Sequence, residues 1–189
     1  VYFDEIDYLG FPFSVSETFQ QRNANSSIIQ SLARVEEIHK LCEQNNRELV
    51  VYLSMAFGNP YNDHWDEEIV AHWTEKLADI GVGTIALADT VGMSNPDSIS
   101  RLFKSLIPEF PYVEFGAHLH SNPSQTNEKI KAAYDAGCRR FDSAMLGFGG
   151  CPMAEDTLTG NIATENIIDF FSELNEDTGI DIEALSQSQ

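Results

Sequence analysis

The chain has 189 residues, of which 42% are hydrophobic, and this argues against a disordered segment and allows one domain with a packed core. Its formal net charge of −19 argues against a nucleic-acid partner, because phosphate binding needs clustered lysine and arginine side chains. No apolar run reaches the roughly 18 residues of a membrane span, and no secretory signal is visible. We therefore expect an acidic, solvated surface without nucleic-acid or membrane partners.

The cysteines point to a reducing compartment. Cys42, Cys138 and Cys151 are odd in number and irregularly spaced, which argues against a disulfide framework. We expect a cytoplasmic protein, or one of the mitochondrial matrix if the source is a eukaryote. Val1 falls inside a stretch that reads as structured, so we also expect further residues before it.

In the first half of the chain, apolar runs of strand length alternate with segments of helical period. The expected elements are a strand at 6–14, a helix at 29–42, a strand at 49–57, a helix between Asp66 and Gly81, and a strand at 84–88. Asp66 is the expected N-cap of its helix, and Gly81 lies just beyond the end. The stretch 20–27 is polar and precedes the first helix.

The second half continues the same alternation. The expected elements are a helix that begins at Asn95-Pro96, a strand at 113–120, a helix that ends at Gly137, a strand at 141–146 and a helix at 164–174. Asparagine before proline is a strong helix start, because the side chain caps the helix and proline fits its first position. The last residues, 186–189, are expected to form a frayed tail.

This alternation predicts a parallel sheet covered by helices, and both an open doubly wound sheet and a closed barrel fit it. No G-x-G-x-x-G fingerprint follows an early strand, which disfavours a dinucleotide-binding sheet. Polar residues instead gather just after the strands, where a barrel has its catalytic rim. A TIM (β/α)8 barrel takes about 250 residues, so we expect residues 1–189 to be a partial barrel domain. It would supply about the last five βα units and lack the N-terminal strands.

The sharpest local signal is His118-Leu119-His120 at the end of a predicted strand. Strand side chains alternate, so both histidines should point into the barrel, while Ala117 and Leu119 face the helices. Two imidazoles on one face can bind one metal ion. A pair of hydrogen-bonded histidines without a metal explains the pattern equally well, and the sequence by itself leaves both readings open.

Two further features follow the last predicted strand. The glycine run 147–150 presents Cys151, and such a run permits a loop that closes over a substrate. The alternative is a turn with an incidental cysteine. Asn161 precedes the final helix, and its amide oxygen is a candidate metal ligand, although a role as N-cap or in a turn is the simpler interpretation.

Together these segments resemble the hydroxymethylglutaryl-CoA lyases of the DRE-TIM metallolyase family. The stretch 147–165, GFGGCPMAEDTLTGNIATE, is similar to the family signature, a G-x-G-G-C-P loop followed by G-N-x-A-T-E. Further similar segments lie, in order, at 16–28, 52–61, 87–92 and 116–121, so the resemblance covers nearly the whole chain. Isopropylmalate and homocitrate synthases and hydroxy-oxovalerate aldolases share the H-x-H strand but not the glycine–cysteine loop.

The resemblance implies roles for individual residues. His118, His120 and Asn161 match the family's ligands for a divalent cation, Mg²⁺ or Mn²⁺, and Cys151 matches its catalytic cysteine. Asp89 matches an acidic residue behind the ligands. The resemblance does not identify the residues that bind the nucleotide of coenzyme A, for which Arg22 is a candidate. For the complete protein we expect an acyl-CoA substrate and a homodimer.

The chain departs from the family pattern in two places. The Arg-Asp pair of the family's first strand, which supplies another metal ligand and a substrate contact, has no counterpart in this sequence. Residues 121–124, Ser-Asn-Pro-Ser, stand where many members have an acidic residue and a T-Y-G-Q run. The first departure leaves the predicted site incomplete, and the second puts the outer contacts of the histidine strand in question.

The implied reaction is retro-Claisen cleavage of 3-hydroxy-3-methylglutaryl-CoA to acetyl-CoA and acetoacetate, a step of leucine degradation and ketone-body formation. His118, or a group beside it, is the expected base, and Cys151 is the expected proton donor. Two alternatives remain. One is a condensing acyl transferase of the isopropylmalate or homocitrate synthase type, and the other is an inactive barrel fragment.

Overall fold

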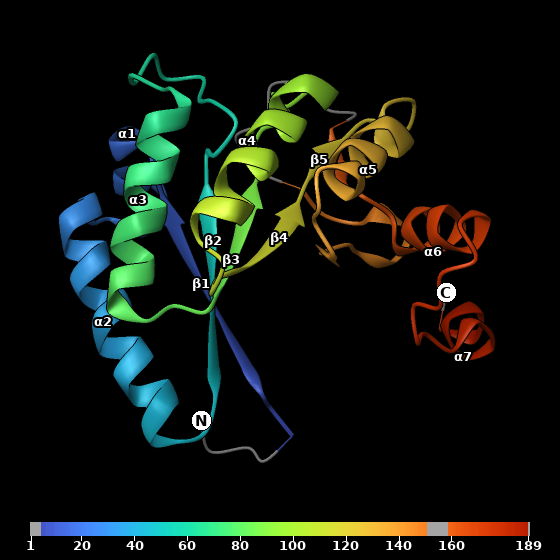
Figure 1. Cartoon of the computed structure of the whole chain (residues 1–189), viewed down its shortest axis with the longest axis horizontal. Helices are drawn as coiled ribbons and strands as arrows, with labels where there is room; N and C mark the ends of the chain where they lie inside the picture. Colours follow the sequence, from blue (N-terminus) through green and yellow to red (C-terminus); the bar gives the residue numbers. More distant parts are fainter. Residues whose placement is uncertain (1–4, 151–158, 189) are drawn as a thin grey trace.

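The computed structural model describes residues 5–150 and 159–188, and its centre is a five-stranded parallel sheet (Figure 1). The sheet order is β1-β2-β3-β4-β6, with the strands at Tyr8–Ser14, Glu48–Ser54, Thr84–Ala88, Glu114–His118 and Arg140–Phe141. A second, two-stranded antiparallel sheet joins β5 (His120–Ser121) to β7 (Gly160–Asn161). Sequential strands are therefore neighbours throughout the main sheet.

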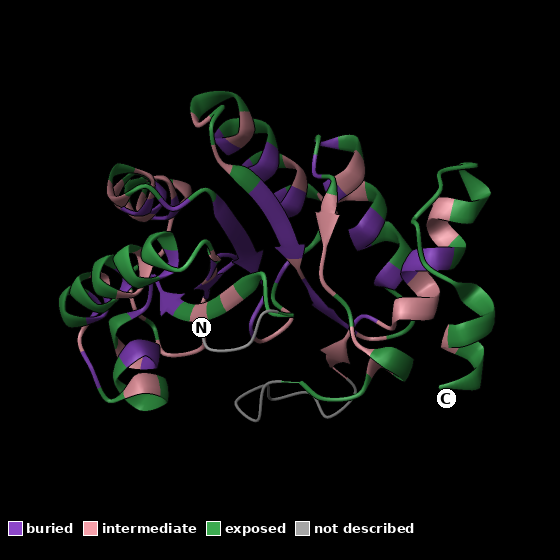
Figure 2. Ribbon diagram, turned by 90° about the horizontal axis from the view of Figure 1, so that it is seen from below, coloured by how far each residue is buried: buried purple, intermediate pink, exposed green. Residues whose placement is uncertain are grey.

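The helices lie between and after the strands, and those that pack on the sheet cover one of its faces. They are α1 (Glu17–Ala24), α2 (Ile28–Gln44), α3 (Glu67–Ile80), α4 (Pro96–Glu109), α5 (Thr126–Asp135), α6 (Thr164–Glu173) and α7 (Ile182–Gln187), with a short 3-10 helix η1 at Met145–Gly147. Figures 1 and 2 show α2, α3, α4 and α5 arranged outside the curve of the sheet. None of the helices in the described ranges is long and apolar enough to cross a bilayer.

The two faces of the sheet differ sharply in side-chain chemistry. The face toward the helices carries the apolar core, and the central strands are buried (Figure 2). Its largest fully buried strand residues are Phe13, Leu53, Ile85 and Leu87. The alternate positions, on the concave face, are mostly small or polar, among them Gly10, Pro12, Ala86, Ala88 and Gly116. This alternation leaves room for a site on the concave side.

Strand order decides between the two architectures that the sequence left open. A doubly wound sheet reverses its order at a switch point and carries helices on both faces. Here the order runs in one direction and the helices lie on one face, as in a (β/α)8 barrel. The α/β barrel class is therefore confirmed, with five parallel strands in the described residues.

Two helix starts form as their sequences predict. The Asp66 side chain accepts a hydrogen bond from the Ile69 backbone N–H, and Gly81 takes a left-handed conformation (φ 104°) after the helix ends. Asn95 and Ser98 form a reciprocal capping box at the start of α4. These caps satisfy backbone N–H groups that the first helical turn leaves without partners.

Several boundaries differ from the sequence prediction. The polar stretch 20–27 contains most of α1, whose start is capped by Ser16, so its lack of an apolar stripe hid a helix. The predicted strand 49–57 ends at Ser54, because Met55 turns to a positive φ of 60°. Residues 186–187, predicted as frayed, belong to α7, which begins after the N-cap Asp181.

The largest error concerns the predicted strand at 141–146. Only Arg140 and Phe141 join the sheet, and the chain then forms a single bridge, Ala144 to Ala163, before entering η1. The predicted strand at 113–120 is also divided, since β4 ends at His118 and β5 pairs with β7 instead. Local apolar character does not reveal which partner a backbone finds, and the partner decides where a strand ends.

The buried face should dominate stability. Replacing Leu87→Ala should lower the free energy of unfolding by about 2–5 kcal/mol, because the side chain is fully buried between sheet and helices. Leu41→Ala, at an exposed position of α2, is the matched control and should cost less than about 1 kcal/mol. Chemical denaturation of both variants measures the difference. Equal losses would contradict the assignment of the core to this face.

Candidate active site

Polar residues at the carboxyl ends of β2, β3 and β4 meet around one cavity on the concave face of the sheet. Its volume is about 240 Å³, and it is lined by Pro12, Tyr52, Ser54, Ala88, Thr90, His118 and His120. The carboxyl ends of parallel strands meet at one edge, so residues far apart in sequence line the same cavity. This is where the sequence predicts the catalytic rim.

The two histidines share this cavity although the strand that carries them is divided. Ala117 and Leu119 are buried in the core on the helical side, and the rings of His118 and His120 lie 5.4 Å apart, edge to face. The change of partner at Leu119 is useful to the site. It sets His120 directly opposite Asn161 in the β5–β7 pair.

The ring of His120 is held at both nitrogens. Its Nδ1 lies 2.9 Å from the carbonyl oxygen of Asp89, which can only accept, so Nδ1 carries the proton. Its Nε2 lies 3.0 Å from Oδ1 of Asn161. The Asn161 amide nitrogen donates to the Phe148 carbonyl at 2.9 Å, which fixes the amide with its oxygen toward the ring. Nε2 and Oδ1 therefore face each other as two acceptors.

Electrostatics keep this arrangement free of a bridging proton. Burial lowers the pKa of His120, and the neighbouring His118 lowers it further, whereas the contacts with Asp89 and Asn161 oppose the shift. A neutral imidazole with Nδ1 protonated has only a lone pair at Nε2. Two lone pairs 3.0 Å apart repel each other unless a cation lies against both.

The chemistry of this donor pair fits a divalent cation. Ligands about 2.1 Å from Mg²⁺ in an octahedral shell lie about 3 Å from their neighbours, which matches the separation of Nε2 and Oδ1. In the described part of the chain, however, no three His, Cys, Asp or Glu side chains gather as a complete metal site. The described residues could therefore supply only part of a coordination shell.

His118 has a partner that the sequence analysis missed. Its Nδ1 lies 3.4 Å from Oδ2 of Asp142, and its ring packs edge-on against Tyr52 at 5.2 Å between centroids. Asp142 comes directly after β6, just as Asp89 comes directly after β3. The signal for it was therefore in the sequence, but extending that strand to 146 concealed it. Burial, with the charge of Asp142, raises the pKa of Tyr52, so its phenol stays a donor.

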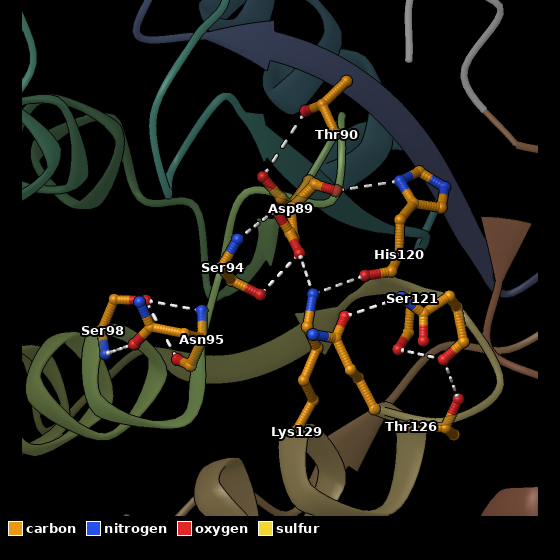
Figure 3. Close-up of polar contacts among 12 residues, drawn as sticks. Asp89, Thr90, Ser94, Asn95, Ser98, His120, Ser121, Thr126 and Lys129 are labelled. Carbon is orange, nitrogen blue, oxygen red and sulfur yellow. Dashed lines mark hydrogen bonds and ion pairs between the residues drawn. The ribbon is translucent and has the colours of Figure 1, made fainter. Parts of the chain in front are cut away.

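Asp89 lies behind His120 and is fully engaged (Figure 3). Its carboxylate accepts from the backbone N–H and hydroxyl of Ser94 and from the ammonium of Lys129. Its own N–H donates to the His118 carbonyl at 3.0 Å. Lys129 was not anticipated from the sequence, because a lysine within an amphipathic helix usually faces solvent.

The glycine run packs directly against Asn161. Gly147 and Gly149 have positive φ angles of 68° and 87°. A Cβ at Gly147 would lie 3.0 Å from the Asn161 carbonyl oxygen, and one at Gly149 would lie 3.1 Å from its amide nitrogen. The run therefore needs glycine for conformation and for space. Cys151, which follows it, lies outside the described residues.

Two other expectations have clear outcomes. The N-cap of α6 is Ala163, so the alternative that Asn161 caps this helix is wrong. Cys42 lies in α2, within the predicted helix 29–42, and Cys138 lies just after α5; both are buried free thiols. Burial raises the pKa of Cys138 to about 12, so this thiol is unreactive. Arg22, the candidate for binding coenzyme A, has the central carbon of its guanidinium 4.8 Å from the centre of the Tyr61 ring.

Comparison with known proteins places this geometry in a family. The model of the HMGL-like family matches residues 6–189, nearly the whole chain. The chain belongs to the HMGL-like family. The fold is therefore that of solved structures named as hydroxymethylglutaryl-CoA lyases rather than a dinucleotide-binding fold.

Relatives with assigned names are about one third identical to this HMGL-like chain over the residues that align. The hydroxymethylglutaryl-CoA lyase of Pseudomonas mevalonii is 31% identical over 174 residues, which are 92% of the chain and 58% of that protein. The (R)-citramalyl-CoA lyase of Chloroflexus aurantiacus is 33% identical over 172 residues, 91% of the chain and 54% of that protein. The chain spans about half the length of these relatives.

A solved structure agrees with the sequence comparison. The crystal structure of hydroxymethylglutaryl-CoA lyase from Pseudomonas aeruginosa superposes with a TM-score of 0.85 at 32% identity. The match covers 95% of this chain and 59% of that one. The parallel sheet and its helices thus follow the lyase barrel over almost all of the chain.

The protonation of His120 is directly testable. Because burial disfavours the imidazolium, the ring should stay neutral as the pH falls through the ordinary value of 6.5. Below that pH, His120 binds a proton in the unfolded chain but stays neutral in the folded protein. The free energy of unfolding should therefore decrease as the pH falls below 6.5. Ring ¹⁵N chemical shifts of the metal-free protein, with and without denaturant, measure both states. A folded-state transition at or above pH 6.5 would contradict the neutral ring.

Proposed function

We propose that this chain is part of a divalent-metal-dependent lyase that cleaves 3-hydroxy-3-methylglutaryl-CoA to acetyl-CoA and acetoacetate. The observation that carries the proposal is the pair of acceptors formed by His120 Nε2 and Asn161 Oδ1, 3.0 Å apart beside His118. This pair calls for a cation, and it lies at the carboxyl ends of the strands, where barrel enzymes hold their sites. The names of the relatives support the same activity.

The proposal includes a longer protein. Five parallel strands do not close a barrel of eight, and the matched relatives are about twice as long as the match. We infer that residues 1–189 form a partial (β/α)8 domain completed by other strands of the same protein, which as a whole forms a homodimer. Those strands would bring the missing metal ligand, a carboxylate, and an arginine for the substrate.

His118, His120 and Asn161 would hold the cation, Mg²⁺ or Mn²⁺, with a carboxylate and water completing its shell. When bound, the cation acidifies the tertiary hydroxyl of the substrate and fixes its orientation. Asp89 acts behind the ligands, because its backbone carbonyl accepts a hydrogen bond from Nδ1–H of His120 and so directs the Nε2 lone pair toward the cavity. The small residues on the concave face of the sheet leave space for the acyl chain.

The hydroxyl proton would pass to Asp142, the group beside His118, whose Oδ2 lies 3.4 Å from Nδ1 of His118. A His118 ring that holds the cation has no second lone pair to accept this proton. The hydroxyl oxygen becomes the ketone of acetoacetate as the bond to the thioester-bearing carbon breaks. The electron pair of that bond moves to the acetyl-CoA fragment as an enolate. Tyr52, whose phenol stays protonated, lines the same cavity and can donate a hydrogen bond to the substrate.

The enolate carbon takes its proton from Cys151. A thiol with an ordinary pKa of about 8.5 is a suitable donor near neutral pH. The glycines at 147–150 place the backbone that leads to Cys151 against Asn161, and so beside the proposed cation ligands. A closed loop would also exclude water from the enolate.

One relative favours a second candidate substrate. The (R)-citramalyl-CoA lyase is as similar to this chain as the hydroxymethylglutaryl-CoA lyases are. Both names describe cleavage of an acyl-CoA, so the two candidate substrates differ in the acyl group. Acetyl-CoA release from each of the two thioesters, measured under the same conditions, distinguishes them. A condensing acyl transferase would instead consume acetyl-CoA, and an inactive fragment would do neither.

The cation ligands can be tested without turnover. In the complete protein, Asn161→Ala and His120→Ala should each weaken Mn²⁺ binding by more than about 100-fold, because each removes a direct ligand. His72→Ala, at an exposed position of α3, is the control and should leave the affinity unchanged. Calorimetric titration of the metal-free proteins gives the constants. Unchanged Mn²⁺ affinity in both site variants would contradict the proposed ligands.

Substitution of Cys151 tests whether its thiol donates a proton or only contributes to the structure of the loop. Cys151→Ser should lower turnover by about 10²–10⁴-fold, because the hydroxyl holds its proton far more tightly than a thiol does. Mn²⁺ affinity should stay the same, since sulfur is not a proposed ligand. Cys42→Ser, in the buried face of α2, is the control and should reduce stability rather than rate. Near-normal turnover of Cys151→Ser would make the loop structural.

A further inference from the structure

Lys129 is an unusual residue for its position. It lies one turn into α5, and 1% of its surface is exposed, whereas lysine is almost never fully buried unless it is paired. Lys131, two residues later, is an ordinary surface lysine that forms an ion pair with Asp135. The burial of Lys129 therefore needs a reason that helix periodicity does not supply.

Its ammonium has two partners, both within the candidate site. Nζ donates to Oδ2 of Asp89 at 2.9 Å and to the carbonyl oxygen of His120 at 2.9 Å (Figure 3). Among the ion pairs of the described residues, Lys129–Asp89 is the one with both side chains about 1% exposed. Desolvating two charges is expensive, and replacing such a pair by apolar residues often stabilises a protein. Stability alone is thus a poor explanation for it.

The contacts form a closed ring around His120. Lys129 holds the His120 carbonyl, Asp89 holds Lys129 through its carboxylate, and the Asp89 carbonyl holds Nδ1 of the His120 ring. The backbone of His120, which also pairs with Asn161 in the β5–β7 sheet, and the orientation of its ring are therefore both tied to Asp89. The hydroxyl of Ser121, the next residue, donates to the Asn122 carbonyl and not to His120.

We propose that Lys129 is a positioning residue, which fixes His120 so that its Nε2 meets Asn161 at the spacing a divalent cation requires. This inference rests on the proposed function, because it concerns the same cation. Lys129 acts through His120 and Asp89 and touches neither substrate nor metal. Within residues 5–150 and 159–188, it is the one side chain that hydrogen-bonds to both the His120 backbone carbonyl and the Asp89 carboxylate.

The decisive experiment separates charge pairing from positioning in the complete protein. Lys129→Met keeps an unbranched side chain of nearly the same length but leaves the buried Asp89 carboxylate without a cationic partner. Both thermal stability and Mn²⁺ affinity should therefore fall. The double variant Lys129→Met, Asp89→Asn removes both charges. Its thermal midpoint should return toward the wild-type value, while its Mn²⁺ affinity should remain about 10–100-fold weaker, the usual loss on removing support behind a ligand.

Lys131 supplies the control for these variants. Lys131→Met, on the same helix, should change neither quantity, since its ion pair is exposed. Recovery of Mn²⁺ affinity together with stability in the double variant would show that the pair is only structural and would overturn the proposal. Wild-type cleavage of hydroxymethylglutaryl-CoA tests the proposed function separately, because the affinity ratio of variant to wild type does not depend on which thioester is cleaved.

A measurement on the unmodified protein covers the case in which the variants do not fold. The Lys129 ammonium should give a ¹⁵N–¹H signal protected from solvent exchange, because Nζ is buried and bonded to two oxygens. On titration with Mg²⁺, this signal and the ring signals of His120 should shift along one binding curve. A Lys129 signal that does not move while His120 responds would overturn the proposal.

Discussion

One buried carboxylate, that of Asp89, holds together the part of the fold on which the site depends. It lies at the end of β3 and receives donors from Ser94 before α4 and from Lys129 on α5. A carboxylate taken out of water must have such partners, so these segments have little freedom to move independently. The Asp89 backbone adds bonds to His118 and His120. The end of β3 and the start of the histidine segment thus move as one unit.

The contrast between the two faces of the sheet explains why the site is where it is. Large apolar side chains toward the helices supply the burial that stabilises the fold, so the concave face is free to carry small and polar residues. Gly10 and Gly116 illustrate the consequence, because a Cβ on either would press on Tyr52 or on Arg140 across the concave face. The cavity at His118 and His120 follows from this division of roles.

The lyase proposal depends on loops more than on strands. Asn161 reaches His120 only because β4 breaks at Leu119 and the next residues pair with β7. The glycine run then lies on the other side of Asn161 and fixes its amide through the Phe148 carbonyl. Residues from three separate segments therefore define one pair of facing acceptors. Relatives named for different acyl-CoA substrates are compatible with this arrangement, since the pair addresses the cation rather than the acyl group.

The sequence by itself determined the alternation of parallel strands and helices, the positions of most helices, and His120 and Asn161 as candidate site residues, because periodicity, capping residues and the H-x-H and glycine motifs are local signals. The order of the strands in the folded sheet then decided for a barrel over a doubly wound sheet. It also placed Ala117 and Leu119 on the helical side, since strand side chains alternate. It did not reveal the break in β4, the short β6 or the role of Asp142, because the hydrogen-bonding partner of a strand comes from elsewhere in the chain. Only the tertiary structure could bury Lys129, for a charge on a helix surface goes inside only when another segment brings a carboxylate to meet it.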